Sequence, residues 1–130
     1  MTSPYPGPRP IARLTVQAEP EVLGLCRHAL AGALMGVAID EDTVEDLKLV
    51  LSEVCKNAIE HAYSGARGVI EIEFRISPGE FEAAVRDHGR GLSEGAARGT
   101  GWSAMASLTT RHAVRTAETG GTLVTFARTF

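Results

Sequence analysis

The sequence predicts an α+β fold: a two-layer α/β sandwich in which helices cover one face of a mostly antiparallel sheet. Three observations carry this prediction. Two helical patterns follow a short strand near the start, two alternating segments lie in the middle, and a glycine-rich turn joins the last two strands. Helices with one apolar face can bury it against one side of such a sheet.

The composition is typical of one globular domain, which we place at residues 11–130. The net charge of −3 argues against nucleic acid as a direct partner, because phosphate binding needs a basic surface. No run is long and apolar enough for a membrane span or a signal peptide, so we expect a cytoplasmic protein. Residues 1–10 hold four prolines and are predicted to form a disordered or polyproline N-terminal arm.

Residues 11–17 alternate weakly and predict a first strand. A helix then opens at residues 19–21, where Pro20 suits the first turn and the two glutamates favour the positive end of the helix dipole. It runs to about Met35, and Gly36 ends it. Its predicted apolar face has three- and four-residue spacings and consists of Val22, Leu25, Cys26, Ala29, Leu30 and Ala33.

A second helix begins after Asp40, which is a good N-cap residue, and continues to about residue 62. Glu53 and Asn57 lie one turn apart, roughly 100° from the centre of the helix's apolar stripe. They are therefore expected at its border, where one side is buried and the other can face a cleft. The stripe itself consists of Leu47, Leu51, Val54, Ala58 and Ala62.

Two strands are predicted over residues 70–76 and 81–87, because apolar and polar residues alternate there and Ser77-Pro78-Gly79-Glu80 is a turn sequence. They should form an antiparallel pair with one face on the core. Asp87 continues the inward-facing set of its strand. An acid at that position needs a partner, since burial of an unpaired carboxylate is unfavourable.

Residues 92–98 have no periodicity and are predicted to form a loop. A short helix should open at Gly101, and a hairpin of residues 113–118 and 122–130 closes the chain. Both cysteines, Cys26 and Cys55, fall inside helical patterns. We interpret them as small hydrophobic residues in a reducing compartment, with a disulfide or a metal site as the weaker alternative.

Four short segments, residues 53–61, 87–91, 99–101 and 121–122, together predict a nucleotide site. The first presents an acid and an amide on one helix face. The second places an acid at a strand end, beside glycines that allow close approach. The third stands at a predicted helix start, which favours an anion such as phosphate. Amide oxygens suit Mg²⁺, so the set indicates a metal-bound nucleotide.

These segments resemble the sequence boxes of the GHKL ATPase superfamily, which includes gyrase, Hsp90, MutL and histidine-kinase catalytic domains. Residues 53–61 look like its N-box, residues 87–91 like its G1 box and residues 99–101 like its G2 box. The Gly-Thr pair at 121–122 matches the one before the last strand. Within the superfamily the chain is most similar to stand-alone anti-sigma-factor serine kinases of the RsbW and SpoIIAB type.

The resemblance implies ATP and Mg²⁺ as cofactors. It also implies binding of a sigma factor, phosphorylation of an anti-anti-sigma protein of the STAS type on serine, and a homodimer. It assigns Glu53 as the general base, Asn57 as the Mg²⁺ ligand and Asp87 as the acceptor for the adenine amino group. The other positions implied for ATP binding are His61, Gly89, Gly91, Gly99, Thr100, Gly101 and Thr122. His61 has a second interpretation, as a residue that ends the helix.

Two departures from the pattern leave alternatives open. The loop at residues 92–98 is short, and Trp102 follows the G2 box where relatives commonly carry further glycine and leucine. A short lid favours a nucleotide-gated binding module that exchanges partners with little or no kinase activity. A detached histidine-kinase catalytic domain is a third possibility, against which the missing phosphoacceptor helices count. Trp102 itself is interpreted as a core or interface residue rather than a base-stacking one.

Overall fold

The computed structural model describes residues 10–62, 67–89, 102–116 and 120–130, with the backbone alone for residues 61 and 62. The predicted N-terminal arm, apart from Pro10, and the predicted loop at residues 92–98 lie outside these ranges. The elements are β1 (Ala12–Gln17), α1 (Val22–Leu34), α2 (Glu41–Asn57), η1 (Ala58–Ala62), β2 (Val69–Ser77), β3 (Glu80–Asp87), α4 (Ser103–Leu108), β4 (Arg111–Thr116) and β5 (Thr122–Thr129).

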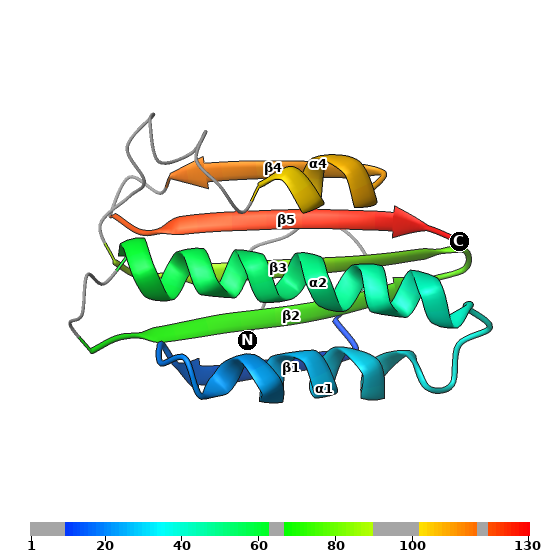
Figure 1. The fold of residues 1–130 in the computed structure, drawn as a ribbon, viewed down its shortest axis with the longest axis horizontal. Coiled ribbons are helices and arrows are strands. Elements are labelled where there is room, and N and C mark those ends of the chain that lie inside the picture. The colour runs from blue at the N-terminus through cyan, green and yellow to red at the C-terminus, as the bar shows by residue number, and fades with distance from the viewer. Residues whose placement is uncertain (1–9, 63–66, 90–101, 117–119) are drawn as a thin grey trace.

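The five strands form one antiparallel sheet in the order β1-β2-β3-β5-β4. Helices α1, α2 and α4 lie on the same side of this sheet, with α2 across its centre (Figure 1). The predicted two-layer α+β architecture is therefore confirmed. The order also makes β3 and β5 neighbours at the centre, although α4 and β4 separate them in the sequence.

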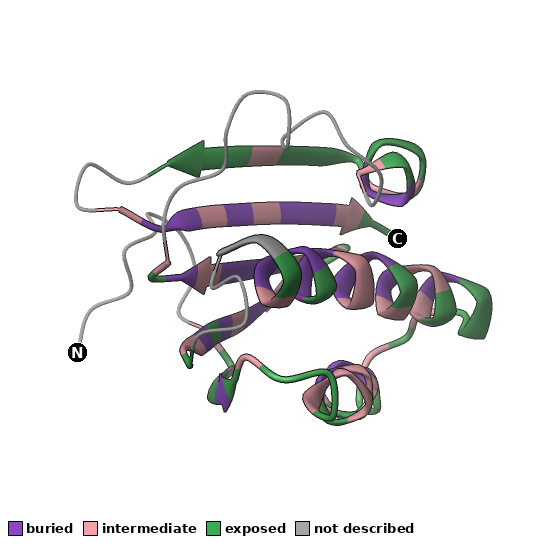
Figure 2. Ribbon diagram, turned by 60° about the vertical axis from the view of Figure 1, so that its left-hand side comes forward, coloured by how far each residue is buried: buried purple, intermediate pink, exposed green. Residues whose placement is uncertain are grey.

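The middle hairpin follows the predicted period of two on its inner face, although Arg75 of β2 and Ala84 of β3 are buried as well. Ile70, Ile72 and Phe74 of β2 are fully buried, as are Phe81 and Ala83 of β3. β5 continues the same inward face, and the purple and pink bands along it show the alternation (Figure 2). The edge strand β4 is mostly exposed.

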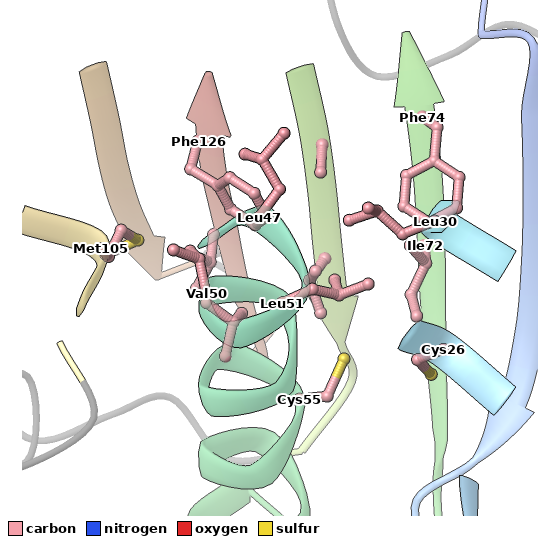
Figure 3. Close-up of a cluster of buried hydrophobic side chains, with 14 of the residues drawn as sticks. Cys26, Leu30, Leu47, Val50, Leu51, Cys55, Ile72, Phe74, Met105 and Phe126 are labelled. Atoms are coloured by element: carbon pink, nitrogen blue, oxygen red, sulfur yellow. The ribbon is translucent and has the colours of Figure 1, made fainter. Parts of the chain in front are cut away.

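The core lies between this sheet face and the helices. Leu47, Val50 and Leu51 of α2 are completely buried, and Met105 of α4 belongs to the same core (Figure 3). Cys26 and Cys55 are free thiols with no exposed surface, in agreement with the interpretation as small hydrophobic residues. None of the helices in the described part of the chain is long and apolar enough to cross a membrane.

The α1 helix corrects one detail of the predicted apolar face. Its buried residues are Cys26, Leu30 and Leu34, whereas Leu25 is 56% exposed. The other predicted residues, Val22, Ala29 and Ala33, are partly buried and pack against the core. Leu25 lies at the border of this face, and its side chain is mostly exposed.

The α2 helix begins as predicted. Asp40 is its N-cap: the carboxylate accepts a hydrogen bond from the backbone amide of Thr43 at 2.8 Å and another from the Thr43 hydroxyl at 3.0 Å. Its end differs from the prediction, because the α-helix stops at Asn57 and a π-helical turn, η1, follows. A π turn has more residues per turn than an α-helix. Asn57 and His61, four positions apart, are therefore no longer separated by about one turn, as they would be in an α-helix.

Candidate functional site

The site begins at the junction of the two central strands. Asp87 is the last residue of β3 and faces Thr122, the first residue of β5. Its Oδ1 accepts two backbone hydrogen bonds, one from the amide of Gly89 and one from the amide of Thr122, each at 3.2 Å. The two bonds fix one carboxylate oxygen and leave the other, Oδ2, outside this pair of contacts. Asp87 thus has the partners that burial of an acid requires.

Burial raises the pKa of the Asp87 carboxyl above its ordinary value. The backbone hydrogen bonds from Gly89 and Thr122 and the nearby His88 act in the opposite direction without reversing it. Only 6% of Asp87 is exposed, so desolvation of the charged form dominates. The carboxyl therefore binds a proton more tightly than a solvated aspartate and gains from a further donor.

The turn before β5 lies very close to the backbone of Asp87. Gly120 and Gly121 both have positive φ, at 94° and 88°. A Cβ built on Gly121 would lie 2.3 Å from the carbonyl oxygen of Asp87, which no side chain tolerates. The close contact of the two backbones is what brings the Thr122 amide within reach of Asp87. Glycine is required at position 121 for both its conformation and the space.

A pocket opens beside this junction. Asn57 of α2, Asp87 of β3 and Thr122 of β5 supply its polar lining. Within the described part of the chain, the rest of the lining consists of Val54, Ala58, Val85, Val124 and Trp102. An apolar slot with a few convergent polar groups is the usual form of a small-molecule site.

Three buried polar atoms of α2 and β5 have no hydrogen-bond partner within the described ranges: Glu53 Oε2, Asn57 Nδ2 and Thr122 Oγ1. Buried polar atoms are nearly always satisfied in folded proteins, and exceptions often mark a functional site. Two of the three atoms belong to residues that line the pocket. Two residues of the pocket lining, Asn57 and Thr122, therefore carry unused hydrogen-bonding capacity.

The residues fit a nucleotide with Mg²⁺ better than they fit a metal held by protein alone. Among the residues with described side chains, no group of three or more His, Cys, Asp or Glu side chains could hold an ion. Mg²⁺ usually keeps several waters and takes one or two protein ligands plus phosphate oxygens. A single amide such as that of Asn57 is compatible with that manner of binding.

The structure brings together three of the predicted site residues, Asn57, Asp87 and Thr122, and adds the Gly89 amide as a hydrogen-bond donor to Asp87. Glu53 lies one turn before Asn57 in α2, half-buried, and is not part of the pocket lining. His61 falls in η1, and its side chain is not described. Four predicted positions lie outside the described ranges: Gly91, Gly99, Thr100 and Gly101.

Sequence reasoning did not anticipate the apolar walls or the role of Trp102. Val54 was predicted only as part of the apolar stripe of its helix, and Val85 and Val124 only as residues within the predicted strands. Trp102 does pack against the core, in agreement with its interpretation, but it also lines the pocket. Its place directly after the glycines of residues 99–101 was the available signal.

Comparison with known proteins places this geometry in a family. Residues 16–128 match the model of the histidine kinase-like ATPase domain. The chain is 35% identical over 77 residues to the serine-protein kinase RsbW of Bacillus velezensis, and 36% identical over 77 residues to that of Bacillus subtilis. Each match covers 58% of this chain and 48% of the relative, so the chain spans about half the length of the curated relatives it matches.

The fold has a solved counterpart. A crystal structure of the RsbU and RsbW domains of a Mycobacterium tuberculosis protein superposes with a TM-score of 0.71, over 92% of this chain and 33% of that chain. Its sequence identity of 22% supports the fold alone. The family match spans nearly the whole domain and includes the junction of Asp87 and Thr122. The chain therefore belongs to the histidine kinase-like ATPase domain family.

Proposed function

We propose that this chain binds ATP with Mg²⁺ in the pocket beside Asp87, and that it acts as an anti-sigma factor and protein serine kinase. In this role it sequesters a sigma factor and phosphorylates an anti-anti-sigma protein of the STAS type. The observation that carries the proposal is the junction of β3 and β5, where a buried acid and two unsatisfied polar atoms surround an apolar pocket. The similarity to RsbW kinases supports the choice of substrate class.

Adenine recognition is assigned to Asp87 and Thr122. The Oδ2 atom of Asp87 would accept a hydrogen bond from the exocyclic amino group, which gives this oxygen a donor of its own. The Thr122 hydroxyl, buried and unsatisfied, would bond a ring nitrogen directly or through a water. Three valines, Val54, Val85 and Val124, would contact the purine ring.

Metal and phosphate binding is assigned to Asn57. The amide oxygen would be one ligand of Mg²⁺, with phosphate oxygens and waters completing the shell. The bound ion would neutralise charge on the phosphates. Asn is a poor helix former, and its presence at the buried end of α2 is better explained by this role than by propensity.

The transfer itself is assigned to a reaction between ATP and a serine hydroxyl of the partner. The hydroxyl oxygen forms a bond to the γ-phosphorus, the bond from that phosphorus to the β–γ bridging oxygen breaks, and ADP leaves. The hydroxyl proton passes to the carboxylate of Glu53. Glu53 lies one helical turn from Asn57, which would place the base close to the metal-bound phosphates.

One observation favours a second candidate function. Glu53 is not among the residues that line the pocket, whereas Asn57, Asp87 and Thr122, which are assigned to nucleotide and metal binding, are. A nucleotide-gated module that exchanges partners needs these nucleotide-binding residues but no catalytic base. Under either function the partners are a sigma factor and a STAS-type protein, the protein acts as a cytoplasmic homodimer, and nucleic acid and membrane are not bound directly.

The test is incubation of the purified chain with labelled ATP, Mg²⁺ and the STAS-type protein encoded by a neighbouring gene. We expect label on the partner, and none on a partner variant whose acceptor serine is replaced by alanine. Calorimetry on the same samples measures ATP binding separately. Binding without transfer would replace the kinase by the binding module, and the absence of both would overturn the nucleotide assignment.

A further inference from the structure

The single tryptophan of the chain, Trp102, is one wall of the candidate nucleotide pocket. It precedes α4 directly, and its carbonyl oxygen accepts a hydrogen bond from the amide of Ala106 at 3.0 Å. This bond fixes the backbone at the start of the helix. The indole lies in the same lining as Asn57, Asp87 and Thr122, and it also packs against the core.

The pocket is too small for a base in this arrangement. Its cavity volume is about 10 Å³, whereas a single water molecule needs roughly 10–15 Å³ on the same scale. A purine is many times larger than a water. At least one wall must therefore move before adenine can reach Asp87.

Among the described residues that line the pocket, the others are poor candidates for such a movement. Val54, Val85 and Val124 are between 2% and 5% exposed and lie within α2 and the two central strands. The Asp87 carboxylate is held by a hydrogen bond from the Thr122 backbone amide. Trp102, by contrast, is only partly buried and stands outside the helix and the sheet. A side-chain rotation at one terminal position is much easier than a shift of packed core elements.

We propose that Trp102 is a movable wall of the nucleotide site. Its indole fills the base position in the free protein, rotates out when adenine enters, and then stacks on one face of the purine. The valines contact the ring from the other side, and Asp87 accepts a hydrogen bond from the amino group at the edge of the ring. This inference rests on the proposed nucleotide binding and adds a residue that selects for an aromatic base, because stacking requires a flat ring.

The first test uses fluorescence excited at the red edge of the indole absorption, where the two tyrosines of the chain do not absorb, so that the signal comes from Trp102. Adenosine, ADP and ATP should each change its intensity or emission maximum, with a midpoint equal to the affinity from calorimetry. Inorganic tripolyphosphate, which has no base, should leave it unchanged. Equal responses to tripolyphosphate and ATP would overturn the inference, as would ATP binding with no fluorescence change. If calorimetry detects no ATP binding at all, the proposed function fails first.

The second test compares two substitutions. Trp102→Phe keeps a flat ring and should retain ADP affinity within about threefold, whereas Trp102→Ala should lower it on the order of tenfold. Leu108→Ala is the matched control, since Leu108 also packs α4 against the core but does not line the pocket. An equal loss in the Leu108 variant would show that packing of α4, not stacking, is responsible. If Trp102→Ala does not fold, Trp102→Leu, which fills space without a flat ring, takes its place.

Discussion

Thr122 donates its backbone amide to Oδ1 of Asp87, and the same two residues are paired in the register of β5 and β3. The acid is thus positioned by main-chain atoms at the end of the central strand pair. Its second contact, from the Gly89 amide, also comes from the main chain. A substitution that keeps an oxygen at Oδ1 should therefore preserve the local geometry, which makes Asp87 a favourable position for testing recognition separately from folding.

Asp87→Asn should weaken binding of ATP by about tenfold to a hundredfold. The asparagine keeps an acceptor for the two backbone amides, but it presents an NH₂ donor where the adenine amino group needs an acceptor. A mismatched buried hydrogen bond costs roughly 1–3 kcal/mol. Calorimetry measures the effect. Asp46→Asn is the control, since Asp46 is an acid of the same domain that pairs with Arg128 away from the pocket. Equal ATP affinity for wild type and Asp87→Asn would remove the assignment of Asp87 to adenine recognition.

The stability of the free protein should depend on pH through Asp87. Because its pKa is raised in the folded state, protonation favours folding. This contribution is fully present below the ordinary pKa of about 3.8 and is lost as the pH rises through the higher folded-state pKa. Asp87→Asn mimics the protonated form, so its melting temperature relative to wild type should increase over that window and then level off. Thermal denaturation across pH checks this, and a difference independent of pH would contradict it.

Glu53→Ala and Asn57→Ala should separate chemistry from binding. Glu53 acts on a proton that moves in the transition state, so its loss should reduce phosphoryl transfer by about 10²–10⁴ and leave ATP and partner binding intact. Asn57 acts on the metal in the bound ground state, so its loss should also abolish the Mg²⁺ dependence of ATP affinity. Glu45→Ala, an exposed acid of the same helix, is the control. Undiminished transfer by Glu53→Ala would remove the base assignment alone.

Gly121→Ala should destabilise the fold and weaken nucleotide binding together. The alanine would be strained at a φ of 88° and its Cβ would overlap the carbonyl of Asp87. Backbone strain alone costs roughly 1–3 kcal/mol. Two further glycine variants, measured by urea denaturation, separate the effect of backbone strain from the effect of steric overlap. Gly79→Ala has positive φ and a nearest contact of 3.6 Å, so it should be strained without overlap. Gly32→Ala, in α1 with nothing within 4 Å, should instead gain up to about 1 kcal/mol.

Much of the fold could be predicted because its signals are local. The hairpin of β2 and β3 has a strict period of two, and the Asp40 cap has a recognisable residue type. The meeting of Asn57, Asp87 and Thr122 was predicted from the resemblance, since each residue belongs to a recognisable segment. Nothing in the spacing alone joins three elements so far apart in the sequence.

The features that were missed depend on packing between distant segments. The π turn at η1 leaves no mark in a helical pattern, because the residue types suit an α-helix equally well. The contact of Gly121 with the carbonyl of Asp87 and the position of Trp102 beside Asn57 arise only after the sheet has formed. The exposure of Leu25 has the same origin: the sequence marks an apolar residue, but the surface that packs against the helix decides how far its apolar face is covered.

The bond between Asp87 and Thr122 joins residues 35 positions apart, whereas β2 and β3 are joined by a tight turn. A short loop closes at much lower entropic cost than a long one, so the β2–β3 hairpin should form early and β5 should dock later, with α4 and β4. The pocket is complete only after that late docking. A nucleotide that binds the finished pocket should therefore slow the unfolding of the chain far more than it speeds its folding.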